Sequence, residues 1–119
     1  MSKMSKEKGK RGEREFAAVL RSFGFEARRG QQFSGGDDSP DVVCPSLPSI
    51  HFEVKRVEKV NLPIAYIQAA ADGVGKTPVV VTRKNGGNWM AYLTADDLLL
   101  LLQRIENLSK LAGCTSKEQ

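Results

Sequence analysis

The chain has 119 residues, of which 40% are apolar and 27% charged, so it is long enough for one small domain and is neither fibrous nor disordered in composition. Its net charge is +4, and the first 11 residues carry this whole excess, with five basic side chains against one acid. We predict a basic, flexible arm over residues 1–11, a single domain over 12–111 and a frayed tail over 112–119.

Several classes of protein are excluded by simple patterns. No apolar run approaches the roughly 20 residues that span a bilayer, and no signal-peptide core follows the basic N-terminus, so we expect an intracellular protein without membrane contact. Cys44 and Cys114 lack metal-ligand spacing and are expected to be free thiols. The basic arm suits phosphate binding through counterion release, although a solvated tail explains the same charge.

The first half of the chain predicts one helix and three strands. Apolar residues at helical spacing, closed by a glycine, predict a helix over residues 12–23. A short strand is expected over 25–29, followed by a loop rich in Gly, Ser and Asp up to residue 40. Strands over 41–44 and 50–56, separated by a turn with two prolines, are expected to pair as a hairpin.

The second half of the chain predicts two helices and two strands. We predict a helix over 64–72, strands over 78–83 and 88–93, and a last helix that Thr94 caps and that ends near residue 111. The order α, β, β, β, α, β, β, α predicts the α/β class, with a mixed sheet flanked by helices.

The last helix contains five consecutive leucines, residues 98–102, which surround its whole circumference. Because a small domain covers only one side of a helix, we hypothesise that the other side packs against a second copy of the chain. The alternative is a helix that lies in a groove of its own domain.

The segment IHFEVK, residues 50–55, places its titratable side chains on one face of the predicted strand. Alternation directs His51, Glu53 and Lys55 to the face opposite the core, and hairpin pairing would bring Asp41 close to Glu53. Two converging carboxylates favour Mg²⁺ or Mn²⁺, and Lys55 would lie beside the charge that develops in phosphodiester hydrolysis. Glu13, near the start of the first helix, is a candidate third carboxylate.

The acid-x-Lys triplet is common on exposed strands, but here it follows Pro-Asp and a Gly-rich loop. This linked pattern resembles the PD-(D/E)xK nuclease superfamily, and most of all the archaeal-type Holliday junction resolvases and their phage or prophage relatives. The motifs that carry the resemblance are Lys8-Gly9, Glu13-Arg14-Glu15, Ser34-Gly35, Ser39-Pro40-Asp41, Phe52-Glu53-Val54-Lys55, Pro78 and Trp89.

The resemblance implies a restriction-endonuclease-like core and a homodimer that nicks branched DNA. It also implies that Glu13, Asp41, Glu53 and the carbonyl of Val54 serve Mg²⁺, for which Mn²⁺ substitutes, and that Lys55 positions the attacking water. Two alternatives stay open: a nuclease that acts on flaps, ends or duplex sites, and an inactive DNA-binding protein with the same fold.

Further residues are candidates for contact with DNA or with the site. His51 and Gln68 are candidates for accessory roles, although an incidental strand histidine and a surface glutamine explain them equally. Residues 73–77 read GVGKT, but they lie between a helix and a strand, so no P-loop and no nucleotide cofactor is expected. The basic and polar candidates for DNA binding are Lys8, Lys10, Arg11, Arg14, Arg28, Arg29, Ser34 and Arg56.

Overall fold

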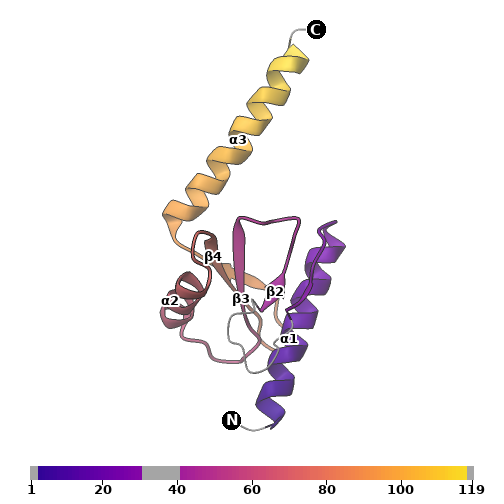
Figure 1. Ribbon diagram of the computed structural model, residues 1–119, viewed down its shortest axis with the longest axis vertical. Coiled ribbons are helices and arrows are strands. Elements are labelled where there is room, and N and C mark those ends of the chain that lie inside the picture. The colour runs from indigo at the N-terminus through magenta and orange to yellow at the C-terminus, as the bar shows by residue number, and fades with distance from the viewer. Residues whose placement is uncertain (1–2, 31–40, 118–119) are drawn as a thin grey trace.

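The computed structural model describes residues 3–30 and 41–117, with side chains described for 9–30 and 41–113 (Figure 1). Ser34 and most of the predicted Gly-rich loop lie outside these residues. The described elements follow the predicted order and confirm the mixed α/β class. In chain order they are α1 (Lys3–Ser22), β1 (Arg28–Arg29), β2 (Val42–Val43), β3 (Ile50–Lys55), α2 (Leu62–Asp72), β4 (Thr77–Thr82), β5 (Met90–Tyr92) and α3 (Ala95–Lys117).

The main sheet has the strand order β3-β4-β5. β3 and β4 run parallel, with Glu53 opposite Val80, and α2 makes the crossover between them. β5 pairs antiparallel with β4, so the sheet is mixed. The strand that carries the acid-x-Lys triplet, β3, is therefore an edge strand of this sheet, beside β4.

The expected hairpin between the second and third strands is wrong. β2 pairs antiparallel with β1, in a separate two-stranded sheet. Two successive turns cause the separation, because the carbonyl of Cys44 accepts a hydrogen bond from the amide of Leu47, and the carbonyl of Leu47 accepts one from Ile50. The chain therefore enters β3 without forming a ladder with β2.

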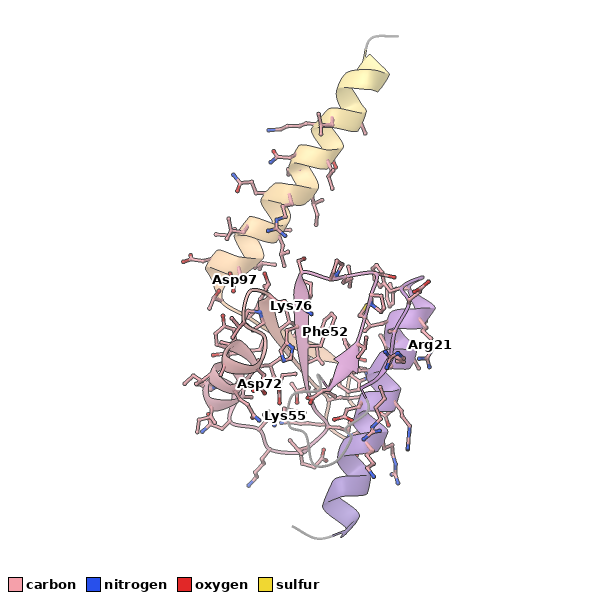
Figure 2. The ribbon with its side chains drawn as sticks, in the orientation of Figure 1. Arg21, Phe52, Lys55, Asp72, Lys76 and Asp97 are labelled. Atoms are coloured by element: carbon pink, nitrogen blue, oxygen red, sulfur yellow. The ribbon has the colours of Figure 1, made fainter. Side chains whose placement is uncertain are left out.

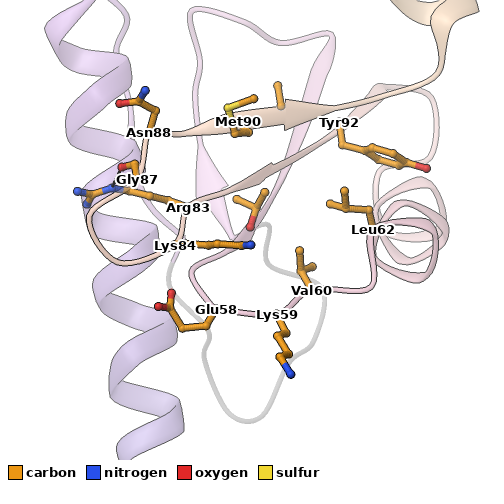
Figure 3. A pocket seen from close by; sticks show the side chains of 12 residues that line it. Glu58, Lys59, Val60, Leu62, Arg83, Lys84, Gly87, Asn88, Met90 and Tyr92 are labelled. Carbon is orange, nitrogen blue, oxygen red and sulfur yellow. Dashed lines mark hydrogen bonds between the residues drawn. The ribbon is translucent and has the colours of Figure 1, made fainter.

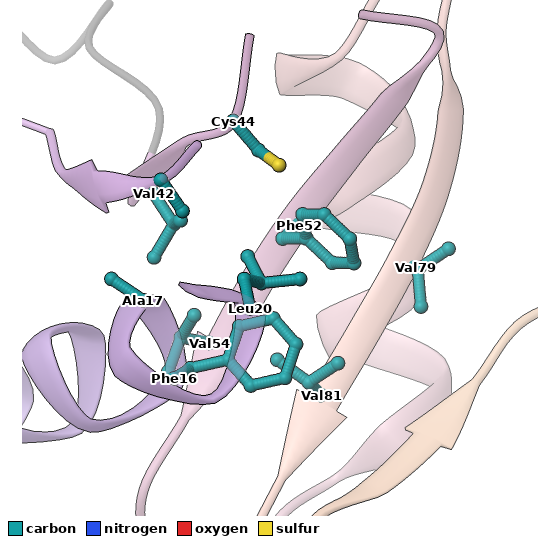
Figure 4. Close-up of a cluster of buried hydrophobic side chains, with 10 residues drawn as sticks. Phe16, Ala17, Leu20, Val42, Cys44, Phe52, Val54, Val79 and Val81 are labelled. Carbon is teal, nitrogen blue, oxygen red and sulfur yellow. The ribbon is translucent and has the colours of Figure 1, made fainter. Parts of the chain in front are cut away.

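Helices cover both faces of the main sheet. On the first face, α1 packs Phe16, Ala17 and Leu20 against alternate side chains of β3 and β4 (Figure 4). The ring centroid of Phe16 lies 5.2 Å from that of Phe52 and 5.1 Å from that of Trp89. This cluster is the principal core, and burying such side chains contributes about 1.5–3 kcal/mol each to stability.

The second face lies under α2, where Ala65 and Ala69 pack on Val80. The small alanine side chains let the helix approach the strands closely. The same face of β3 carries His51 and Glu53, and both are therefore buried. The face of β3 that we predicted to lie opposite the core, with His51, Glu53 and Lys55, is therefore the face that α2 covers.

The two terminal helices are longer than predicted. α1 begins at Lys3, so the predicted start at Gly12 is wrong. Gly12 lies inside the helix, where α1 packs closely on Arg56. A Cβ at this position would come 2.4 Å from the Cβ of Arg56, so the close packing requires a glycine. α3 likewise continues to Lys117, beyond the end predicted near residue 111. The division into arm, domain and tail remains a prediction.

α3 projects away from the body of the molecule (Figure 1). Its base is held by Tyr66, whose hydroxyl donates to Oδ2 of Asp97 at 3.3 Å, and by the predicted cap, in which Thr94 Oγ1 accepts from the amide of Asp97. Leu99 is 60% and Leu100 55% exposed, so the alternative of a groove in the chain's own domain is wrong for the described residues. Over this part of the chain, no helix combines the length and apolar content that a membrane crossing requires.

Candidate active site

Asp41, at the start of β2, reaches across to the backbone of β3. Its Oδ2 accepts a hydrogen bond from the amide of Val54 at 2.9 Å. This bond places the carboxylate beside the strand position of Glu53 without the hairpin that we expected. Burial, and then the negative charge of Glu53, raise the pKa of Asp41 to about 7.

Glu53 occupies the middle of the site and is only 4% exposed. Its two carboxylate oxygens have different neighbours. Oε2 lies 3.4 Å from Nζ of Lys55, whereas Oε1 lies 3.9 Å from Nε2 of His51. Glu53 is thus shared between an ammonium group on one side and an imidazole on the other.

Glu13 approaches the same region from α1. Arg29 Nε donates to its Oε1 at 2.9 Å. Burial raises the pKa of Glu13, Arg29 opposes that rise, and the charge of Glu53 adds to it. Glu13, Asp41 and Glu53 are therefore close enough to influence one another's ionisation, and they come from three different elements.

Lys55, at the end of β3, is held in place by two side chains. Its Nζ donates to Oε1 of Gln68 on α2 at 3.5 Å and pairs with Glu53. The side chain is 30% exposed, so the ammonium group is accessible from solvent while its position is constrained. Figure 2 labels Lys55 in this part of the molecule, on the strand that α2 covers.

The three carboxylates are the kind of donor that a divalent cation binds. Two of the three carboxylates have raised pKa values because ionising them close together in a buried place is unfavourable. A cation between them would reverse that effect, and carboxylate oxygens are the ligands that Mg²⁺ and Mn²⁺ prefer. Asp41, Glu53 and Glu13 are the residues that would hold it, and Lys55 lies next to this position.

A second group of potential ligands lies on the α2 side of β3. The nearest ligand atoms of His51, Glu53 and Asp72 all lie within 4.8 Å of one another. Sequence reasoning included His51 but missed Asp72, which is the last residue of α2. No local pattern could have found it, because only the packing of α2 on β3 brings it to His51.

The predicted DNA-contacting residues divide into two groups. Arg11, Arg14 and Arg28 are exposed and available to phosphates, whereas Lys10 is half-buried. Arg29 is engaged by Glu13, as described above. The side chain of Lys8 and all of Ser34 lie outside the described residues.

Arg56 also belongs to the engaged group. Its Nε pairs with Oε1 of Glu15 at 3.0 Å, and its Nη1 donates to the carbonyl of Arg83 and to Oδ1 of Asn85. Its side chain is only 11% exposed. Arg56, which we predicted to contact phosphate, therefore joins α1, β3 and the turn after β4.

A hollow of about 720 Å³ runs beside β4 and β5, and Figure 3 shows Lys59, Leu62, Arg83 and Tyr92 among its lining residues. None of the three carboxylates lines it. We therefore place the candidate active site at Glu53 and not in this hollow.

Comparison with known proteins gives the family. The family model described as archaeal Holliday junction resolvase (Hjc) matches residues 4–98, which include all of α1 but its first residue, both sheets and the start of α3. A comparison with curated proteins found no match. The matched region contains Glu13, Asp41, Glu53 and Lys55 and excludes most of the leucine-rich helix. The chain therefore belongs to the archaeal Holliday junction resolvase family, within the PD-(D/E)xK nuclease superfamily.

Proposed function

We propose that this chain is a metal-dependent endodeoxyribonuclease that hydrolyses phosphodiester bonds in branched DNA, with a preference for four-way junctions. The observation that carries the proposal is the hydrogen bond from the amide of Val54 to Asp41, which brings this carboxylate beside Glu53 and Lys55. Family membership supports nuclease chemistry on branched DNA.

Each side chain of the site has a role in this proposal. Asp41 and Glu53 provide ligand oxygens, with Glu13 as a third group from α1. When bound there, a divalent cation polarises the phosphoryl oxygen and lowers the pKa of water. Lys55 donates a hydrogen bond to the attacking water and stabilises negative charge on the phosphate, because its ammonium group is held at the edge of the carboxylates.

Gln68 acts on this reaction through Lys55. Its Oε1 accepts from Nζ of Lys55 at 3.5 Å, so it restricts the ammonium group to the side of the site that faces α2. The side chain is exposed, and its contact is with Nζ of Lys55. We therefore propose a positioning role for Gln68.

The DNA backbone is proposed to follow the exposed basic residues near the site, Arg11 and Arg14 on α1 and Arg28 on β1. Contacts of this kind fix the position of a duplex without reading its bases. This mode of binding agrees with an enzyme that selects DNA by shape, and it predicts that affinity falls steeply with salt concentration.

The second part of the proposal is a homodimer formed through α3. Leu98, Leu101, Ile105 and Leu108 recur at alternating spacings of three and four residues, which is the pattern of a coiled coil. Leu98 is 43%, Ile105 56% and Leu108 66% exposed and Leu101 is half-buried, so the described part of one chain leaves most of this stripe uncovered.

The stripe matches itself in an antiparallel arrangement. Leu98 of one copy then lies opposite Leu108 of the other, and Leu101 lies opposite Ile105. The same register brings the acidic first turn of α3, Asp96 and Asp97, toward Lys110 of the other copy. A two-fold dimer would present two sites to the two strands of a junction, which a symmetric pair of nicks requires.

A cleavage panel tests the function. The full chain is incubated with a labelled four-way junction, a flap and a linear duplex in Mg²⁺, Mn²⁺ or chelator. We expect metal-dependent cutting, fastest on the junction and lost in Asp41→Asn. Equal rates on all substrates would overturn the junction preference, and binding of DNA without cutting in either metal would overturn the nuclease proposal.

A further inference from the structure

His51 is buried in an unusual state for a polar side chain. It is 6% exposed, and its Nε2 is buried with no hydrogen-bond partner. The nearest charged atom, Oε1 of Glu53, lies at 3.9 Å, which is too far for a hydrogen bond. Burying such a nitrogen removes its bonds to water and replaces them with none, so the position is unfavourable unless something else binds there.

The surroundings of this nitrogen consist of metal-binding groups. Asp72, at the end of α2, and Glu53 place carboxylate oxygens so that all three ligand atoms lie within 4.8 Å of one another. Asp72 is exposed and Glu53 buried, so the cluster has a closed inner side and an outer side open to solvent. Figure 2 labels Asp72 beside the strand that carries Lys55.

Gly73 makes this approach feasible. A Cβ at that position would lie 2.5 Å from the Cβ and Cγ of His51, so any larger residue would push the end of α2 away. The glycine therefore lets the last turn of α2, with Asp72, pack directly on the imidazole. The group of His51, Glu53 and Asp72 therefore depends on the glycine that ends α2.

We propose that His51, Glu53 and Asp72 form a binding site for a divalent transition-metal ion, such as Zn²⁺ or Mn²⁺. One imidazole nitrogen and two carboxylates suit these ions, whereas Mg²⁺ prefers oxygen ligands alone. Metal–ligand distances are about 2.0–2.2 Å, so binding draws the three ligand atoms closer together, and the exposed Asp72 can supply the movement.

This site adjoins the proposed carboxylate site of Asp41 and Glu13, because Glu53 belongs to both. Oε1 of Glu53 faces His51, and Oε2 faces Lys55 on the other side. An ion at His51 therefore constrains the same carboxylate that the proposed hydrolytic site uses. The binding proposal does not depend on nuclease activity, because metal binding at His51 is measurable without DNA.

The chain has one histidine, so its imidazole signals are unambiguous in tag-free protein. We expect titration with Zn²⁺ to shift the imidazole ¹⁵N resonances of His51, with saturation at one equivalent for this site, and Mg²⁺ at the same concentration to leave them in place once Asp41→Asn has disabled the neighbouring carboxylate site. The shift should persist in Asp41→Asn, which removes a ligand of the other site only. Imidazole resonances that do not respond to Zn²⁺ would overturn the proposal.

Two variants give a second measurement. Asp72→Asn keeps the shape of an exposed side chain, and we expect it to weaken Zn²⁺ binding at His51 at least about tenfold, because even outer-shell changes have effects of about 10–100-fold. Asp96→Asn, another exposed aspartate but on α3, is the matched control and should bind like the parent. Equal affinity in Asp72→Asn and the parent would contradict the assignment, whatever the outcome of the cleavage panel.

Discussion

Strand β3 and helix α3 distribute polar and apolar side chains in opposite ways. On β3, His51 and Glu53 are 6% and 4% exposed, under a helix that covers them. On α3, Leu108 and Leu111 are 66% and 69% exposed, on a helix that leaves the body of the molecule. Neither arrangement is explained by the stability of one isolated chain.

The difference indicates that the two regions are stabilised by different kinds of partner. Buried carboxylates and an imidazole without a hydrogen bond are unfavourable until a cation neutralises or binds them. Exposed leucines on a coiled-coil stripe are unfavourable until another apolar surface covers them. The proposed cation would serve the first region, and the proposed second copy of the chain would cover the second.

Lys55→Ala is the change with the largest expected effect on the β3 region. We expect cleavage of a four-way junction to fall about 100–1,000-fold, because a fixed donor at developing charge contributes that much. Junction affinity, measured by fluorescence anisotropy, should stay within about twofold, since the bound backbone contacts other cations. Lys84→Ala, an exposed lysine in the turn after β4, is the control, and unaltered cleavage in Lys55→Ala would remove the assigned role.

Arg56→Ala tests whether a buried charge near β3 serves folding instead of binding. The change removes the pairing with Glu15 and the bonds to the turn after β4. We expect the free energy of unfolding, from urea titration, to drop by about 2–3 kcal/mol. Arg28→Ala, at an exposed arginine, should change it by less than about 0.5 kcal/mol. Equal losses in both would argue that Arg56 is not structural.

The buried charge of Asp41 predicts how metal-free stability depends on pH. Its pKa rises from 3.8 to about 7 on folding, so the unfolded chain releases the proton first. The contribution to stability is complete below about pH 4 and is lost as the pH rises through 7.

Asp41→Asn isolates this contribution, because the amide oxygen still accepts from Val54 and carries no charge. At pH 8 without metal, we expect the variant to be more stable than the parent by about 1–2 kcal/mol, with no such gain at pH 4. Urea titration at both pH values measures the difference. A parent chain that is as stable as the variant at pH 8 would show that Asp41 is not destabilised by its surroundings.

Ile105→Lys tests the apolar stripe of α3, and of the changes described it has the smallest expected effect. A charge in the apolar stripe should raise the dissociation constant of the dimer at least about tenfold, or about 1.4 kcal/mol, without unfolding the domain. Gln103→Lys, on the same helix but outside the stripe, is the control. Sedimentation equilibrium measures both, and a parent chain that is monomeric at micromolar concentration would refute the dimer.

Much of the molecule could be predicted from local patterns. The alternation of residues 50–55 correctly separates Phe52 and Val54 from His51 and Glu53, because adjacent strand residues point to opposite faces. The cap at Thr94 is also confirmed, since it depends on residues within one turn. The predicted start of α1 at Gly12 was wrong because residues 3–11 carry no apolar side chain apart from Met4, so no periodicity marks them as helical.

The sequence by itself determined which side chains share a strand face, that the last helix carries five consecutive leucines, and that an acid and a lysine stand at residues 53 and 55. Only the tertiary structure decided that Asp41 reaches Val54 without a hairpin, that α2 buries Glu53, and that Asp72 meets His51. The physical reason is the range of the interactions. Periodicity acts within one element, whereas the element that covers a face is selected by packing between segments distant in the chain.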